Sequence, residues 1–226
     1  MHLSIIIPAL NEAANIVATL APLQHMRGQG TEVILVDGGS SDATRALAGP
    51  WVDVVIDSKP GRATQMNAGA AAATGEALLF LHADSRLPEE ADQIVLAALA
   101  GAPTAWGRFD VAIVGHHFMF PVIAWCMNQR SRYTGIATGD QAIFMTREIF
   151  GLAGGFPDQA LMEDIELCKR LKKRAPPVCR PEKIVTSGRR WEKHGLWRTI
   201  LLMWRLRLRY WMGASPTDLH RAYYGN

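Results

Sequence analysis

Long uninterrupted apolar runs are missing from this sequence. No stretch is long enough to span a bilayer. The N-terminus starts directly with the apolar residues 3–7 and lacks the charged region and cleavage site of a signal peptide. The three cysteines, Cys126, Cys168 and Cys179, have no metal-ligand spacing and cannot all pair. We therefore expect a cytoplasmic protein with free thiols.

Acidic residues are scarce at the end of the chain. Residues 180–226 carry 10 Lys or Arg against 3 Asp or Glu, whereas residues 1–100 carry 5 against 11. The acidic part suits a metal site, and the basic tail suits phosphates or an anionic membrane surface. The presumed cleft is acidic and the basic residues lie in the tail, which disfavours a nucleic-acid-binding role. The length of 226 residues allows one large globular domain.

Short apolar segments alternate with helical patterns in the first hundred residues. Segments 3–7, 32–36, 51–56 and 77–81 predict strands, and an alanine-rich segment ending at Gly75 predicts one of the helices between them. This β-α-β-α-β-α-β order predicts an α/β fold with a doubly wound, mostly parallel sheet. Further along, we expect strands at 105–114 and 142–145 and helices at 89–100, 118–132 and 162–171.

Polar residues follow two of the predicted strands at their carboxyl ends, which is where ligands bind in open α/β sheets. His82 and Asp84 follow segment 77–81, and together they could hold a divalent cation. Asp84 could equally be a turn residue or a helix cap. Asp37 follows segment 32–36 and is placed to accept hydrogen bonds from a nucleobase or a ribose.

Other residues near the same edge are candidate helix caps or a candidate ligand contact. The loop 37–44 is not a dinucleotide fingerprint because its third glycine is missing, but Ser41 or Asp42 can cap the next helix. Asn11 can cap the first helix. Arg62, at the start of the alanine-rich helix, is a candidate for a diphosphate contact.

Taken in order, these segments resemble family 2 glycosyltransferases, which have the GT-A fold. Residues 7–12 resemble the opening strand motif, residues 37–44 the nucleoside loop, and Asn67-Ala-Gly69 the segment before the metal strand. Leu81-His-Ala-Asp84 takes the place of the Asp-x-Asp metal motif, and Glu163-Asp164 that of the catalytic-base pair. Ser187-Gly-Arg-Arg-Trp191 resembles a degenerate Gln-x-x-Arg-Trp motif. The motif sequences at 61–63, 80–84 and 188–191 are most similar to those of a small bacterial subgroup linked to arsenosugar biosynthesis.

The resemblance implies an inverting, metal-dependent transfer of a sugar from a nucleotide diphosphate, with UDP preferred, to the hydroxyl of a small-molecule or lipid-linked acceptor. It implies that Asp164 is the catalytic base and that Glu163 orients its neighbour or the acceptor. Asp84, with His82 beside it, would hold Mn²⁺ or Mg²⁺. The expected contacts of the nucleotide sugar are Pro8, Glu12, Asp37, Arg62, Asn67, Ala83, Arg190 and Trp191.

Two residues depart from the family pattern. His82 replaces the first aspartate of the metal motif, so the site loses one negative charge, and the imidazole could ligate the metal or hydrogen-bond nearby. Ser187 replaces the glutamine of the last motif, which weakens any expectation of a processive, polymer-making enzyme.

Two other functions compete with glycosyl transfer. A sugar nucleotidyltransferase would carry a glycine-rich loop with a following Arg or Lys directly after the first strand, where residues 8–12 here read Pro-Ala-Leu-Asn-Glu. A non-catalytic, membrane-associated nucleotide-sugar binding protein would keep the fold and the basic tail but need no chemistry at Asp164.

The tail divides from the rest of the chain near residue 192. We expect a catalytic domain over residues 1–192 and a basic, aromatic-rich helix and tail over 193–226. In a helix over 194–212, Arg198, Arg205 and Arg209 line one stripe and apolar residues fill much of the rest. Two interpretations remain open. The helix either packs on the catalytic domain with its arginines in solvent, or lies on an anionic membrane at the inner face.

Overall fold

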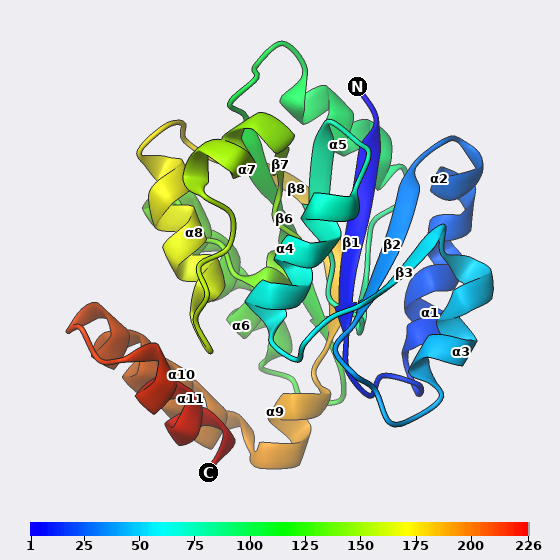
Figure 1. Ribbon diagram of the computed structural model, residues 1–226. Coiled ribbons are helices and arrows are strands. Elements are labelled where there is room, and N and C mark those ends of the chain that lie inside the picture. The colour runs from blue at the N-terminus through cyan, green and yellow to red at the C-terminus, as the bar shows by residue number, and fades with distance from the viewer. Residues whose placement is uncertain (226) are drawn as a thin grey trace.

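All eight β-strands belong to one sheet in the part of the chain that the structure describes. The computed structural model describes residues 1–225, apart from the side chains of Arg190 and His194. Across the sheet the strands follow the order β3-β2-β1-β4-β7-β6-β8-β5 (Figure 1). The strands are β1 (Leu3–Ala9), β2 (Glu32–Asp37), β3 (Val54–Asp57), β4 (Ala77–Phe80), β5 (Ser85–Arg86), β6 (Trp106–Val114), β7 (Phe144–Thr146) and β8 (Val178–Ser187).

The first four strands form the parallel half of the sheet. β1 lies between β2 and β4, and β3 pairs with β2, all in parallel. β1, β2 and β4 are buried almost throughout, which explains why their sequences are continuous apolar runs. The strand expected at 51–56 begins later, at Val54, because Gly49–Trp51 forms a 3₁₀ turn with Pro50 near its start.

The other half of the sheet is mixed. β7 is antiparallel to β4 and β6, β6 is parallel to β8, and β5 is antiparallel to β8. β8 was not predicted, because it is mostly half-exposed and contains Pro181. The register between β6 and β8 shifts between Phe109 and Asp110, opposite Pro181 and Glu182, so the proline lies in a bulge where it is tolerated.

Helices cover both faces of the sheet, as the doubly wound prediction requires. One apolar core joins the sheet to α1, α2, α3, α5 and α6, and a second core on the opposite face joins it to α4, α7 and α8 (Figure 1). The helices of the domain are α1 (Ile16–Leu20), α2 (Gln24–Gly28), α3 (Thr44–Ala48), α4 (Arg62–Ala72), α5 (Ala91–Leu99), α6 (Phe120–Thr134), α7 (Arg147–Ala153) and α8 (Glu163–Lys172).

A helical hairpin follows the sheet in sequence and packs against α8. It consists of α10 (Leu196–Trp211) and α11 (Pro216–Tyr224), and the short α9 (Arg189–His194) leads into it (Figure 1). Leu206 of α10 and Leu219 of α11 are fully buried with Met162 and Ile165 of the α8 region. The helix expected over 194–212 is therefore confirmed as α10. Within the described residues, no helix is long and apolar enough to cross a membrane.

Candidate active site

Asp37 ends β2 at the carboxyl edge of the sheet, where it was expected. It is 5% exposed, and its carboxylate accepts hydrogen bonds from the backbone N–H groups of Gly39 (3.2 Å) and Ser40 (3.0 Å) and from the Ser40 hydroxyl (2.5 Å). These bonds fold the loop after β2 into a fixed turn. Asp37 thus shapes the predicted nucleoside loop from within.

The β1–α1 loop is tied to the same turn. Asn11 does not cap α1, contrary to the prediction, because its side-chain oxygen accepts a hydrogen bond from the Ser41 backbone N–H (2.9 Å) and its own backbone is left-handed, with φ 55°. The Asp42 carboxylate accepts hydrogen bonds from the Thr44 backbone N–H (2.9 Å) and the Ala13 backbone N–H (3.1 Å), and so joins the two loops. Glu12 lies in this joined region.

α4 contributes one charged group to the site and two structural amides. Gln65 is buried and donates hydrogen bonds to the carbonyls of Ala9 and Val36, both at 2.9 Å, which fixes the carboxyl ends of β1 and β2. The side-chain amide of Asn67 forms two hydrogen bonds with the backbone of Phe156. It accepts one from the Phe156 N–H (2.9 Å) and donates one to the Phe156 carbonyl (2.8 Å). Both polar atoms of the Asn67 amide thus bond the Phe156 backbone, and the expected donor contact of Asn67 stays a prediction.

The residues after β4 lie at the centre of the edge. Ala83 is buried, and its carbonyl accepts a hydrogen bond from the Thr19 hydroxyl (2.7 Å). His82 Nδ1 lies 3.3 Å from Asp140 Oδ1, and its Nε2 is buried without a hydrogen-bond partner among the described residues. A carboxylate that fixes one ring nitrogen leaves the other free to bind a ligand.

Asp140 was not predicted. It lies in the 3₁₀ turn Gly139–Gln141, between α6 and β7. Partial burial works against its ionisation, but the nearby His82, Arg62 and Arg130 outweigh that effect and lower the pKa of Asp140. Gly139 must be a glycine for this arrangement, because a Cβ there would lie 2.2 Å from His82 Nε2.

The acid pair begins α8. Glu163 is almost completely buried, and its Oε1 lies 3.6 Å from Arg62 Nη1. Asp164 is more exposed and accepts backbone hydrogen bonds from Gly139 (3.0 Å) and Ile165 (2.7 Å). Met162, just before the pair, holds a left-handed backbone with φ 67°, a strained conformation that aims the first turn of α8.

Burial sets the protonation behaviour of the pair. It raises the pKa of Glu163, and the negative charge of Asp164 raises it further, while Arg62 opposes both. Burial also raises the pKa of Asp164, offset in part by the hydrogen bond from the Gly139 backbone. A carboxylate with a raised pKa is a stronger proton acceptor, which is what a general base requires.

One pocket brings four of the predicted site residues together. Of the predicted site residues, Arg62, His82, Glu163 and Asp164 line it, whereas Asp84 does not. The other lining residues are Met66, Phe80, Gly139, Ile143 and Phe156. Four predicted residues from three separate elements therefore meet at one place.

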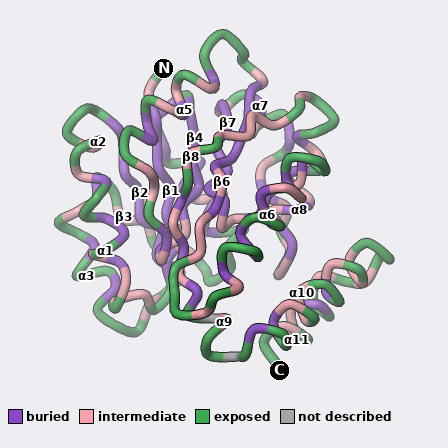
Figure 2. The backbone as a smooth tube through the Cα atoms, turned by 180° about the vertical axis from the view of Figure 1, so that it is seen from behind, coloured by how far each residue is buried: buried purple, intermediate pink, exposed green. Residues whose placement is uncertain are grey.

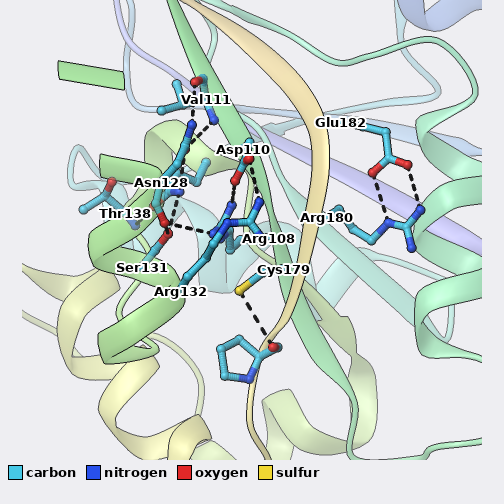
Figure 3. Close-up of polar contacts among 12 residues, drawn as sticks. Arg108, Asp110, Val111, Asn128, Ser131, Arg132, Thr138, Cys179, Arg180 and Glu182 are labelled. Carbon is cyan, nitrogen blue, oxygen red and sulfur yellow. Dashed lines mark hydrogen bonds and ion pairs between the residues drawn. The ribbon is translucent and has the colours of Figure 1, made fainter. Parts of the chain in front are cut away.

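A buried polar network joins α6 to β6 (Figure 3), and Gln141 connects it to the Gly139–Gln141 turn. Asn128 of α6 bonds both backbone groups of Val111 in β6, at 2.8 and 3.0 Å. Ser131 bonds the Asn128 carbonyl, and Gln141 donates to the Ser131 hydroxyl at 3.0 Å. Arg108, fully buried, pairs with Asp110 in the same network. The turn that holds Asp164 and His82 is thus anchored to β6 and α6.

The region after β8 reaches back to the first loop. Arg189 lies 3.8 Å from Glu12 and 3.3 Å from the side-chain oxygen of Asn15, a contact that was not predicted. Trp191 is partly buried against Phe120 and Leu196. The side chain of Arg190, expected near the donor, lies outside the described residues.

A divalent cation fits this edge with one protein carboxylate. Within the described residues, no group of three or more His, Cys, Asp or Glu is arranged to hold a metal alone. Asp84 is half-buried just beyond β4, and no hydrogen bond or ion pair joins it to another described residue. Mg²⁺-type sites commonly combine one or two carboxylates with substrate phosphates and water. Asp84 meets that requirement when a nucleotide diphosphate supplies the phosphates.

Cys168 lies on α8 one helical turn after Asp164. Its side chain is fully buried, and its sulfur lies 3.6 Å from the Ala137 carbonyl. Burial, followed by the charge of Asp164, raises the pKa of the Cys168 thiol to about 12. Cys126 is exposed and Cys179 is half-buried, and all three thiols are free.

Comparison with models of protein families assigns the chain to a family. The model of glycosyl transferase family 2 matches residues 4–152, more than half of the sequence. The chain therefore belongs to glycosyltransferase family 2 and is an enzyme of that family. Glu163, Asp164 and the residues after them lie beyond the matched segment.

Curated relatives agree with this assignment. The chain is 33% identical over 173 residues to a "PGL/p-HBAD biosynthesis glycosyltransferase" of Mycobacterium tuberculosis and to one of Mycobacterium bovis. The match covers 68% of this chain and 62% of each relative, so the chain spans less than two thirds of their length.

Solved structures share the fold. The S. aureus TarS fragment 1–349 in complex with UDP-GlcNAc has a TM-score of 0.66 at 17% identity, covering 83% of this chain and 58% of TarS. The mannosyltransferase PcManGT from Pyrobaculum calidifontis, in complex with GDP-Man and Mn²⁺, has a TM-score of 0.66 at 20% identity, covering 98% of this chain and 68% of PcManGT. The predicted GT-A fold is confirmed.

Proposed function

We propose that the chain transfers a sugar, with inversion, from a nucleotide diphosphate donor to an acceptor hydroxyl, that UDP is the nucleotide, and that the reaction depends on a divalent metal. The observation that carries this proposal is the acid pair on the first turn of α8, which lines one pocket with Arg62 and His82. A base and groups suited to a leaving diphosphate thus share a single pocket.

Asp164 is the base in this proposal. It is the more exposed of the two acids, and its raised pKa favours taking the acceptor proton as the new bond forms. Glu163 is buried against Arg62, so it orients that guanidinium instead of meeting the acceptor.

The leaving diphosphate needs positive charge. Arg62 supplies a guanidinium at the pocket, and a divalent metal bound at Asp84 would add Lewis-acid neutralisation. His82 can join as a ligand or hydrogen-bond donor through its free Nε2. Similar folds crystallised with UDP-GlcNAc, and with GDP-Man and Mn²⁺, support a nucleotide-sugar donor and a metal.

The test is calorimetric titration of UDP with and without Mn²⁺. Wild type is expected to bind UDP with Mn²⁺ and to lose that binding in EDTA. Asp84→Ala should abolish the metal-supported part, and His82→Ala should weaken it less. Equal UDP affinity in wild type, in EDTA and in Asp84→Ala would refute the metal role.

The finer assignment to the bacterial subgroup linked to arsenosugar biosynthesis also stays a proposal. It is supported by the motif sequences at 61–63, 80–84 and 188–191. Transfer to an arsenic-bearing acceptor, compared with simple alcohols at equal concentration, tests it. Equal rates on both classes of acceptor would contradict it.

The division of the chain is proposed as before, with a catalytic domain over 1–192 and a tail over 193–226. We also propose that the tail makes peripheral membrane contact through residues 194–212, since an acceptor carried by a lipid would then meet the site at the membrane surface. The support is the composition of α10, which combines arginines with tryptophans.

A further inference from the structure

α10 is apolar on two opposite faces. Its inner face holds the buried Leu206, which packs against the catalytic domain. Its outer face carries large apolar side chains that are 56–80% exposed and recur every three or four residues, so they form one stripe along the helix. The residues of this stripe are Trp197, Leu201, Trp204, Leu208 and Trp211.

α6 carries a second stripe of the same kind. Phe118, just before the helix, and Val122, Trp125 and Tyr133 are 47–86% exposed and fall on one side of α6. The opposite side holds the buried Phe120, Ile123 and Ala124, so the exposed aromatics are not needed for the core.

The two helices are neighbours. Phe120 and Ile123 of α6 pack against Leu196 at the start of α10, and Ile200 joins this cluster. Figure 2 shows exposed segments on both helices in the view from behind. A monomeric protein rarely exposes so many large apolar side chains on adjacent elements unless they bind something.

We propose that α6 and α10 together form one platform that binds the surface of an anionic membrane. The positive charges beside the α10 stripe favour an anionic membrane as the binding partner. Arg198, Arg205 and Arg209 follow one another along the border of the α10 stripe, and arginines beside tryptophans suit the headgroup region of an anionic bilayer. A second copy of the chain, facing the same stripe, would bring these arginines against one another.

The platform also places the site near the bilayer. Leu206, on the inner face of α10, packs against Met162 and Ile165, the residues that flank the acid pair. The membrane-facing stripe is therefore separated from Glu163 and Asp164 by about the thickness of one helix, ~10 Å. This deepens the proposed function, on which it rests only for the chemistry, by naming an anionic membrane as the surface at which the site works.

The experiment is sedimentation of the full chain with vesicles of phosphatidylcholine, with and without phosphatidylglycerol, at low and high salt. Wild type should bind the anionic vesicles, and salt should weaken the binding. Trp204→Ser in α10 and Trp125→Ser in α6 should each weaken it by roughly tenfold, since a large apolar side chain leaves the interface. Leu152→Ser, an exposed leucine on α7, is the matched control and should bind like wild type.

Each other result overturns the proposal. Unchanged binding of Trp125→Ser removes α6 from the platform. Wild-type protein that ignores anionic vesicles removes the membrane, and a dimer in sedimentation velocity that both tryptophan variants disrupt would identify a second copy as the occupant. UDP binding with Mn²⁺, measured in the same variants, should stay at the wild-type value. If wild type itself fails to bind UDP, the proposed function fails separately from the vesicle result.

Discussion

At the scale of single residues, the site depends on carboxylates that differ in surroundings. Glu163 is buried beside a guanidinium, while Asp164 is more exposed and bonded to two backbone N–H groups. Two adjacent acids on one helical turn thus have different neighbours, which is how a fold gives similar side chains different tasks.

Asp164→Asn removes the proton acceptor and is expected to lower turnover by roughly 10²–10⁴-fold while UDP affinity stays near wild type. In wild type the base must be ionised. Turnover should therefore fall as pH drops through a pKa above the ordinary value of 3.8, because burial raises the pKa of Asp164. Steady-state kinetics across pH measure both effects.

Glu166→Gln, two residues further along α8, is the matched control and should keep most of its activity, because Glu166 pairs with Arg170 outside the pocket. Since asparagine can accept only one of the two backbone hydrogen bonds, the thermal midpoint of Asp164→Asn must be recorded as well. Full activity in Asp164→Asn together with loss in Glu163→Gln would reverse the assigned roles.

Residue-level prediction from sequence reached only some of the site. His82 and Asp84 follow the end of a strand and the acid pair begins a helix, so these residues could be proposed from their order along the chain. Asp140 could not, because its approach to His82 depends on β7 lying antiparallel beside β4. The bonds between the Asn67 amide and the Phe156 backbone could not be predicted either, because the two residues are distant in sequence.

At the scale of elements, the 3₁₀ turn Gly139–Gln141 connects the two halves of the chemistry. Its first N–H holds Asp164, its aspartate faces His82, and its glutamine joins the network under the site. One short segment therefore sets the relative position of the proposed base and of His82, which lies beside the proposed metal site.

Gly139→Ala tests this connection. The added Cβ would lie 2.2 Å from His82 Nε2, so the imidazole has to move away from its position. Turnover and metal-supported UDP binding are expected to fall at least tenfold, about 1.4 kcal/mol, with a much smaller change in thermal midpoint. Gly151→Ala, in α7 with nothing within 4 Å of the new Cβ, is the control and should be neutral or slightly stabilising. Equal effects of the two substitutions would exclude this role for the turn.

The elements themselves were predictable where burial was complete. β1, β2 and β4 are covered on both faces, so their apolar runs carry the signal. β8 escaped because it is half-exposed and bulged around Pro181, which leaves neither a continuous run nor a clean alternation. α10 was predicted as a helix, but which of its faces is inward could be decided only by its contacts with α8.

At the scale of the whole molecule, the helical hairpin is both a cover for α8 and an exposed surface. Leu206 and Leu208 allow the two roles to be tested separately, because they lie two residues apart on opposite sides of α10. Leu206 is 1% exposed and Leu208 is 56% exposed. Leu206→Ala is expected to lower the free energy of unfolding by about 2–5 kcal/mol and to reduce turnover, since Met162 and Ile165 lose a packing partner.

Leu208→Ala should leave the thermal midpoint and the turnover of a water-soluble acceptor unchanged and weaken only vesicle binding. Thermal denaturation and vesicle sedimentation of the two variants are the measurements. If both substitutions lower stability equally, the hairpin does not dock as described.

The burial of Cys168 makes its thiol a probe for the opening of α8. Its thiol has a pKa of about 12 and no exposed surface, so an alkylating reagent can reach it only when α8 moves away from the sheet. Cys126, exposed on α6, should react at once and supplies the internal reference. The delay between the two modifications, followed by mass spectrometry, therefore measures how often the helix that carries Asp164 opens. A nucleotide that steadies the site should lengthen that delay.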